Sequence, residues 1–154
     1  MIGAAVYYSY YSTASLTGTS STEETKKDIE RPIPEESLHG FVEGSLSYPS
    51  ERFPENLTVC AEPYLGDEDT VYCTSTLITD EKYDYGKGYK IEVPVGTYLV
   101  YSQVEGQDYK AYYSEFVKCG LTIDCTEHNP IPVEVIAGKS SFANPNDWYN
   151  TPAE

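Results

Sequence analysis

The fold is decided by Tyr89-Lys90-Ile91-Glu92-Val93-Pro94-Val95-Gly96-Thr97-Tyr98-Leu99-Val100. Apolar and polar residues alternate over its first five positions, which is typical of a strand with one buried face. Pro94 ends this strand because it cannot donate a ladder hydrogen bond, and Val95-Gly96 turns the chain into a second strand over 97–104. The stretch predicts a protein built from strands and short turns.

The rest of the chain continues this pattern without a helical period. About seven strands, at spacings of roughly 10–15 residues, predict an all-β fold, an antiparallel β-sandwich. Residues 138–146 are expected to form a loop, and the single Trp148 is expected to fold back onto the body. The first strand along the chain is expected at 38–48, with Leu38, Val42, Leu46 and Tyr48 on one face. Besides this strand and the two at 89–93 and 97–104, strands are expected at 57–62, 71–77, 110–118 and 131–136.

The four cysteines show no CxxC spacing, which favours disulfides in an oxidising compartment over a zinc site. A turn centred between residues 66 and 67 places Cys60 directly opposite Cys73. Directly opposed Cβ atoms lie about 4.5–5.5 Å apart, near the roughly 3.5–4.5 Å that a disulfide needs. We therefore expect Cys60–Cys73, with Cys119 and Cys125 closing a short loop. The two other connectivities of four cysteines would need long-range partners and stay open.

Several motifs together resemble the carboxypeptidase regulatory-like, or prealbumin-like, sandwich domains. The likeness covers about residues 38–104 and implies a seven-stranded Greek-key sandwich that acts as a structural or binding module. The cysteines and the N-terminal stretch are not part of the family pattern. The residues that carry the likeness are Gly40-x-Val42-x-Gly44-x-Leu46, Tyr48-Pro49-Ser50, Leu57-Thr58-Val59-Cys60-Ala61 and Tyr89-x-Ile91-x-Val93-Pro94-x-Gly96-Thr97-Tyr98-x-Val100.

The N-terminal arm, residues 1–22, reads as a Tyr-rich strand. Residues 23–37 are charged and contain Arg31-Pro32-Ile33-Pro34, which predicts an extended linker between the arm and a sandwich domain at 38–150. Fifteen or so extended residues span about 50 Å, further than a strand needs to return to its own sheet. We expect the arm to be a donor strand for a neighbouring copy. Its subunit-contact face would hold Ile2, Ala4, Val6, Tyr8 and Tyr10, and residues 151–154 form a tail.

Two other interpretations of the N-terminus stay open. The arm could be an ordinary first strand of the same domain. Alternatively, Ile2-Gly3-Ala4-Ala5-Val6 could be the end of a removed signal or anchor helix. No run of about 20 apolar residues is present, and we expect no membrane insertion of the mature chain.

The acidic composition and the sparse histidines limit the function classes. The chain has a formal net charge of −15, which disfavours nucleic acid and anionic lipid as partners. His39 is expected to face solvent, and His128 lies in a loop beside a predicted disulfide. A catalytic set of His128 with a serine lacks any supporting motif. We expect no catalytic residues and no cofactor, and the protein is predicted not to be an enzyme.

Two kinds of modification or ligand remain candidates. The acidic loops Gly66-Asp67-Glu68-Asp69 and Asp80 to Asp84 lack EF-hand spacing, so solvated turns are favoured over calcium. Asn56 in Asn56-Leu57-Thr58 is a candidate acceptor of an N-linked glycan. Ser12 to Thr22 is a candidate for O-linked sugar.

The sequence thus predicts a structural subunit of an extracellular or cell-surface filament. Copies would join head to tail by inserting the N-terminal strand into the next sandwich. The alternative is a monomeric cell-surface module of a lipoprotein or secreted enzyme that binds carbohydrate or protein. The two differ in whether the intact chain polymerises.

Overall fold

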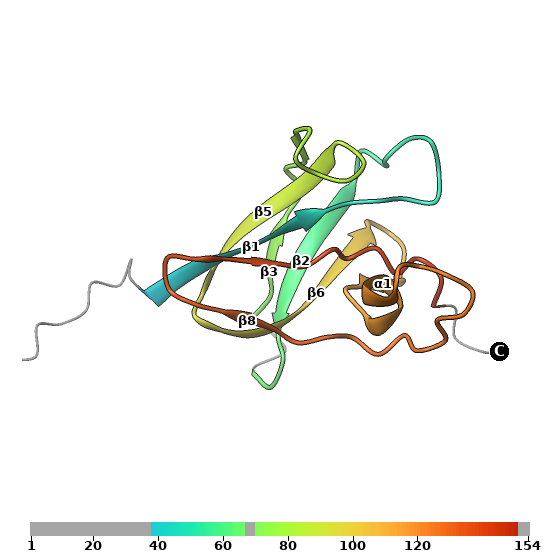
Figure 1. The fold of residues 1–154 in the computed structure, drawn as a ribbon. Helices are drawn as coiled ribbons and strands as arrows, with labels where there is room; N and C mark the ends of the chain where they lie inside the picture. The colour runs from blue at the N-terminus through green and yellow to red at the C-terminus, as the bar shows by residue number, and fades with distance from the viewer. Residues whose placement is uncertain (1–37, 67–69, 151–154) are drawn as a thin grey trace, which may run out of the picture. The chain divides into compact units, whose positions relative to one another are not determined.

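The computed structural model describes residues 38–66 and 70–150. Over these ranges the regular secondary structure is almost entirely β, with nine strands in two sheets and one short helix (Figure 1). No helix within the described ranges has the length and apolar character needed to cross a membrane. The predicted arm at 1–22, the linker at 23–37 and the tail at 151–154 lie outside the described residues.

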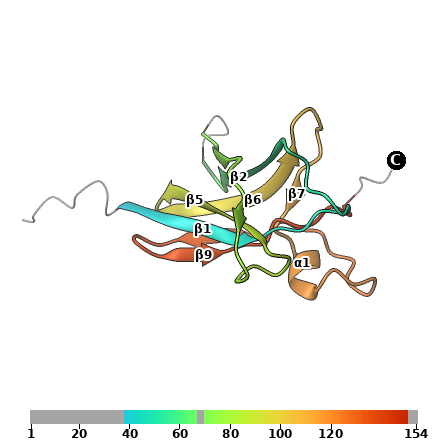
Figure 2. The same cartoon turned by 90° about the horizontal axis from the view of Figure 1, so that it is seen from above.

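The first sheet has four strands built around β1. Strand β1 pairs antiparallel with β5 along all seven of its residues and pairs parallel with β9 on its other side. Figure 2 shows β1 and β9 side by side. The sheet order is β4 (Ile78–Thr79), β5 (Lys87–Pro94), β1 (His39–Ser45) and β9 (Ser140–Phe142).

The second sheet has five strands and is centred on β2 and β6, which pair antiparallel along seven residues. Both β7 and β8 also pair with β6. The order is β3 (Tyr72–Thr74), β2 (Leu57–Pro63), β6 (Gly96–Val104) and β7 (Ala111–Tyr112), with β8 (Val133–Val135) beside β6.

The stretch that predicted the fold links the two sheets. Its first strand is β5 and its second is β6, so the turn at Pro94 to Gly96 carries the chain from one sheet into the other. The alternation has the expected result, because Tyr89 and Val93 on β5 and Val100 on β6 are all fully buried. The two strands supply opposite walls of one core.

The core lies between the sheets, and the described ranges contribute fourteen buried residues to it. Close approach of the chain after β9 also requires glycine on β1, since a Cβ at Gly44 would collide with the backbone of Ala143. The core residues are Val42, Leu46, Leu57, Val59, Ala61, Tyr89, Ile91, Val93, Tyr98, Val100, Val104, Val133, Val135 and Ala143.

The strand predicted at 110–118 is wrong beyond its start. After the two residues of β7, the chain forms helix α1 (Glu115–Cys119). Ser114 occupies the N-cap position with extended backbone, and Gly120 ends the helix with a φ of 104°. Glu115 in the first turn and Lys118 in the last turn suit the helix dipole. These end signals outweigh the β-rich composition of the segment.

Three further expectations differ from the structure. The segment predicted as one strand at 71–77 contains β3, and β4 follows in the other sheet. The loop predicted at 138–146 contains β9, whose partner β1 is far away in sequence. Leu38, expected on the core face, is 44% exposed, because the core begins at Val42.

Candidate functional site

The structure pairs Cys60 with Cys73 and Cys119 with Cys125, which is the pairing the sequence predicts. Cys60 and Cys73 are direct partners across β2 and β3, as the hairpin argument requires. The second disulfide joins the last residue of α1 to the loop after it. Two disulfides are compatible with an extracellular protein.

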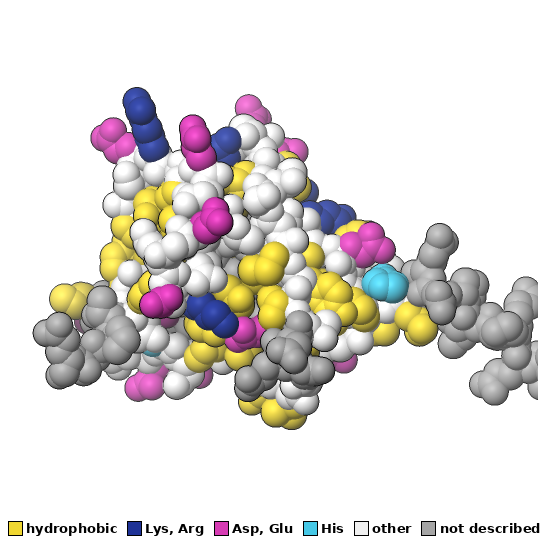
Figure 3. Space-filling model, turned by 180° about the vertical axis from the view of Figure 1, so that it is seen from behind, with side chains coloured by type: hydrophobic (Ala, Val, Ile, Leu, Met, Phe, Trp, Pro, Cys, Tyr) yellow, Lys and Arg dark blue, Asp and Glu magenta, His cyan; other side chains and the backbone are white. Residues whose placement is uncertain are grey.

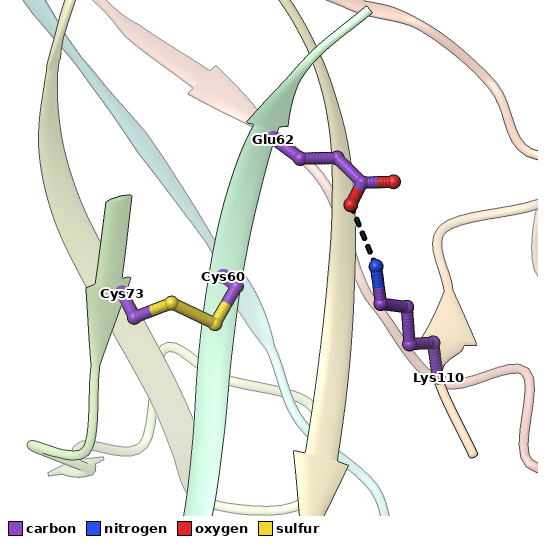
Figure 4. Close-up of a disulfide and its surroundings, with 4 residues drawn as sticks. All are labelled: Cys60, Glu62, Cys73 and Lys110. Atoms are coloured by element: carbon purple, nitrogen blue, oxygen red, sulfur yellow. Dashed lines mark hydrogen bonds and ion pairs between the residues drawn. A yellow bond between two sulfur atoms is a disulfide. The ribbon is translucent and has the colours of Figure 1, made fainter. Parts of the chain in front are cut away.

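The Cys60–Cys73 disulfide lies on the outer face of the five-stranded sheet, since the flanking Val59 and Ala61 face the core. Figure 4 shows it near the ion pair of Glu62 with Lys110, which is part of a polar and aromatic network. Lys110 Nζ lies 2.7 Å from a carboxylate oxygen of Glu62, and the Tyr112 hydroxyl donates to the other oxygen at 2.8 Å. The same ammonium group lies 4.2 Å from the ring centre of Tyr101. The network ties β2 to β6 and β7 through side chains.

Burial and hydrogen bonding shift the titration of this network. Burial, followed by the hydrogen bond to Glu62, raises the pKa of Tyr112 to about 12. Burial disfavours the charged form of Lys110, but the hydrogen bond to Glu62 and the neighbouring tyrosines outweigh it and raise the Lys110 pKa overall. Lys110 therefore stays charged over the physiological pH range.

Apolar side chains are exposed at the hairpin beside this network. Leu65 is 90% exposed, and Tyr64 is 46% exposed. Together with Glu62, Leu99 and Lys110 they line a hollow on the outer face of the sheet. Figure 3 shows hydrophobic side chains gathered on the face opposite to that of Figure 1. This hollow is one candidate interaction surface.

The C-terminal segment, residues 144–148, is attached to the end of β1 by side chains. Asn144 Oδ1 accepts from the Ser45 amide and Asn146 Oδ1 from the Ser47 amide, each at 2.8 Å. Trp148 Nε1 donates to the Ser47 carbonyl, also at 2.8 Å. The side chains of Asn144, Asn146 and Trp148 thus make the hydrogen bonds to this part of the chain that backbone groups would make if the segment were a further strand.

Asp147 connects this segment to three other parts of the chain. The residue is 1% exposed, and its carboxylate accepts from Ser114 Oγ at 2.6 Å and lies 2.8 Å from His128 Nδ1. Its backbone carbonyl accepts from the Tyr109 hydroxyl at 2.9 Å. The Ser114 side chain, which makes no helix-capping bond, is directed to Asp147 instead.

Ser114, His128 and Asp147 are not arranged as a catalytic nucleophile with its general base. In such a pair the histidine accepts the serine proton, whereas Ser114 donates to Asp147 and is fully buried. The His128 ring stacks on Phe116, with 4.5 Å between ring centres. This arrangement anchors the C-terminal segment on α1 and on the loop that contains His128.

An aromatic pocket lies beside this anchor and is the second candidate surface. It has a volume of about 370 Å³. Trp148 meets Tyr48 edge to face, with ring centres 5.0 Å apart, and stacks on Tyr109 at 6.1 Å. The aromatic residues that line the pocket are Tyr48, Phe53, Tyr85, Trp148 and Tyr149.

The other predicted site residues are dispersed. Asn56 is exposed just before β2, and its Nδ2, the atom that a glycan would join, donates to the Glu105 carbonyl at 3.2 Å. His39 lies on β1 and is half-buried. In the second acidic loop, Asp80 Oδ1 accepts from the Lys82 amide.

Parts of the predicted site lie outside the description. The contact residues from Ile2 to Tyr10, the Ser12 to Thr22 run and Asp67 to Asp69 are outside the described residues. The described residues hold no group of three or more His, Cys, Asp or Glu side chains that could bind a metal ion.

Comparison with protein-family models, with curated proteins and with solved structures finds no match. Sequence reasoning did not find the aromatic pocket or the Asp147 anchor. The repeated asparagines of Asn144-Pro145-Asn146-Asp147-Trp148 were the available signal, since asparagine side chains readily bond to backbone groups.

Proposed function

We propose that this protein is a structural subunit of an extracellular filament, which polymerises when the N-terminal strand of one copy pairs with a sheet edge of the next. The observation that supports the proposal is the sheet order of the described residues, in which each sheet ends in strands of only two or three residues. Such short end strands leave backbone groups of their neighbours available for pairing with a strand from another copy.

The described sheets also offer edges where such a strand could add. Strand β3 pairs with β2, and β4 pairs with β5; each is an end strand of its sheet in the order above. Main-chain pairing at an edge supplies affinity, and alternate side chains of the added strand supply register. A head-to-tail contact of this kind builds open filaments.

The finer fold assignment belongs to the same proposal. We assign a prealbumin-like Greek-key sandwich, supported by the path of the chain between the sheets. Strand β1 lies in one sheet, β2 and β3 in the other, β4 and β5 back in the first, β6 to β8 in the second, and β9 in the first again. Repeated passage between two sheets is the feature that Greek-key connections give a sandwich.

The test compares the intact chain with a chain lacking residues 1–22 and with a Val6→Pro variant. Proline removes a ladder donor from the middle of the strand, so both altered chains should stay monomeric in sedimentation while the intact chain forms filaments in electron micrographs. Thr19→Pro, which changes the Gly/Ser/Thr-rich end of the arm, is the matched control and should still polymerise.

Two results would contradict the proposal. Filaments from the shortened chain would show that the contact does not use the arm. An intact chain that stays monomeric at every concentration would favour the alternative, a monomeric surface module. A single cooperative urea unfolding transition of the shortened chain verifies that the sandwich is folded.

A further inference from the structure

The aromatic side chains of the pocket come from three separate segments. The loop after β1 contributes Tyr48 and Phe53, the turn before β5 contributes Tyr85, and the C-terminal segment contributes Trp148 and Tyr149. Figure 2 shows the loop after β1 and the C-terminal segment approaching each other at the α1 end of the sheets. All of the lining residues belong to the described ranges.

The inner wall of the pocket is held in place before any ligand arrives. The hydrogen bond from Trp148 to Ser47 and its edge-to-face contact with Tyr48 fix the indole ring. Asp147, directly before it, is anchored by Ser114 and His128. A ligand that binds against fixed rings loses less affinity to side-chain ordering than one that must arrange them.

The outer wall is aromatic but open to solvent. The Tyr85 side chain is 69% exposed and Tyr149 is 56% exposed. Ser50 and Glu51, which are also exposed, supply a hydroxyl and a carboxylate to the lining. Aromatic faces together with a few polar groups are the combination that a pyranose ring requires, because its C–H faces are apolar and its edges carry hydroxyls.

We propose that this pocket binds a neutral, pyranose-containing glycan. The volume of about 370 Å³ lies within the roughly 300–1,000 Å³ typical of small-molecule sites. The chain carries a formal net charge of −15, which repels acidic sugars but not neutral ones. The glycan would stack on Trp148, Tyr85 and Tyr149, with hydroxyls directed to Glu51. This assignment does not depend on filament formation.

Trp148 provides the readout, because it is the single tryptophan of the chain. The intact protein is titrated separately with neutral hexasaccharides of glucose, mannose, galactose and N-acetylglucosamine while indole emission is followed. At least one should change the emission saturably, with a Kd below about 1 mM. Calorimetry on the same sample checks that the change reports binding.

Variants then locate the site. Tyr85→Ala and Tyr149→Ala should each weaken the binding about tenfold, the loss expected for one aromatic stacking partner. Tyr64→Ala is the matched control, since Tyr64 is 46% exposed but lies outside the pocket. It should bind as the unchanged protein does. Both pocket tyrosines are largely exposed, so their removal should leave the unfolding transition unchanged.

Four results would overturn the proposal. They are no saturable response to any of the four sugars, equal losses in Tyr64→Ala and Tyr85→Ala, a response to choline chloride without one to sugar, and an emission change that depends on protein concentration alone. The choline result would indicate an aromatic cage for a quaternary ammonium group. The concentration result would indicate that a second copy occupies the pocket.

Discussion

The sandwich centre, strands β1, β2, β5 and β6, and the C-terminal region, residues 109–150, are stabilised by different interactions. The centre has two long antiparallel ladders and most of the buried core. The C-terminal region has only short strands, one helix of five residues, and specific bonds to Asp147, Asn144 and Asn146. The stabilisation from apolar burial scales with the buried area and is spread over many residues, whereas each of those hydrogen bonds depends on one side chain.

Removing a core side chain from the centre should have the largest effect. Leu57 is 1% exposed on β2 and belongs to the core cluster. Leu57→Ala should lower the free energy of unfolding by about 2–5 kcal/mol, since it leaves a cavity that the rigid sheets cannot close. Urea denaturation measures this. Leu65→Ala, at a position 90% exposed, is the control and should change stability by less than about 0.5 kcal/mol.

One disulfide joins β2 of the centre to β3, and the other lies in the C-terminal region, which allows a direct comparison. Cys60–Cys73 closes a separation of 13 residues and Cys119–Cys125 one of 6. Double replacement by alanine should cost about 3 kcal/mol for the first and about 2 kcal/mol for the second, because the longer loop restricts the unfolded chain more. Thermal unfolding of the two double variants gives the order. A larger loss for the Cys119–Cys125 pair would contradict the loop-entropy explanation.

Within the C-terminal region, we expect substitution of Asp147 to cause the largest loss of stability. Asp147→Ala leaves the buried Ser114 hydroxyl without its acceptor, and each such group costs about 1–3 kcal/mol. The change should also be local, so Trp148 emission should shift toward that of solvent-exposed indole below the denaturant midpoint. Asp108→Ala, at an exposed aspartate directly before this region, should show neither effect.

Raising the pH into the alkaline range should cause a smaller loss of stability than the substitutions above. Burial raises the pKa of Tyr109 and of Tyr112 to about 12, above the unfolded value of about 10. The fold holds each tyrosine in its neutral form, so this contribution to stability is complete below about pH 10. It is lost as the pH rises through about 12. Both rings are partly exposed, so solvent screening keeps the effect modest.

The measurement is the slope of unfolding free energy against pH above about pH 10. Tyr109→Phe and Tyr112→Phe should each make the decline shallower, since phenylalanine has no proton to lose. Tyr112 anchors β7 to Glu62 in the centre, and Tyr109 anchors the C-terminal region through the Asp147 carbonyl. An unchanged slope in both variants would contradict the assignment of these shifts to the folded state.

The accuracy of the sequence predictions follows the same division. The strands of the centre were found within a few residues of their bounds, because period-two alternation is a local signal and their buried face satisfies it. In the C-terminal region the sequence predicted a strand where α1 forms and a loop where β9 forms. The helix was missed although Ser114 and Gly120 mark its two ends. The cap residues were outweighed by the β-favouring residues Tyr112, Tyr113, Phe116 and Val117.

The aromatic pocket shows why the candidate site was the least predictable part. Tyr48 was expected on one face of the first strand and Trp148 was expected to fold back onto the body, but nothing in either segment indicates the other. Their contact depends on hydrogen bonds between residues 99 and 101 positions apart. Asn144 and Trp148 make those bonds, and their register with β1 is set only when β9 has paired with β1.

The sequence by itself determined the β class of the described residues and the strand–turn–strand at 89–104. It also determined the register that sets Cys60 opposite Cys73. Each of these depends on residues close together in the chain, where alternation, proline and turn symmetry act directly. Only the tertiary structure decided the parallel pairing of β9 with β1, the burial of Asp147 and the assembly of the pocket around Trp148. Those features join distant segments, and no local period encodes which distant partner a segment meets.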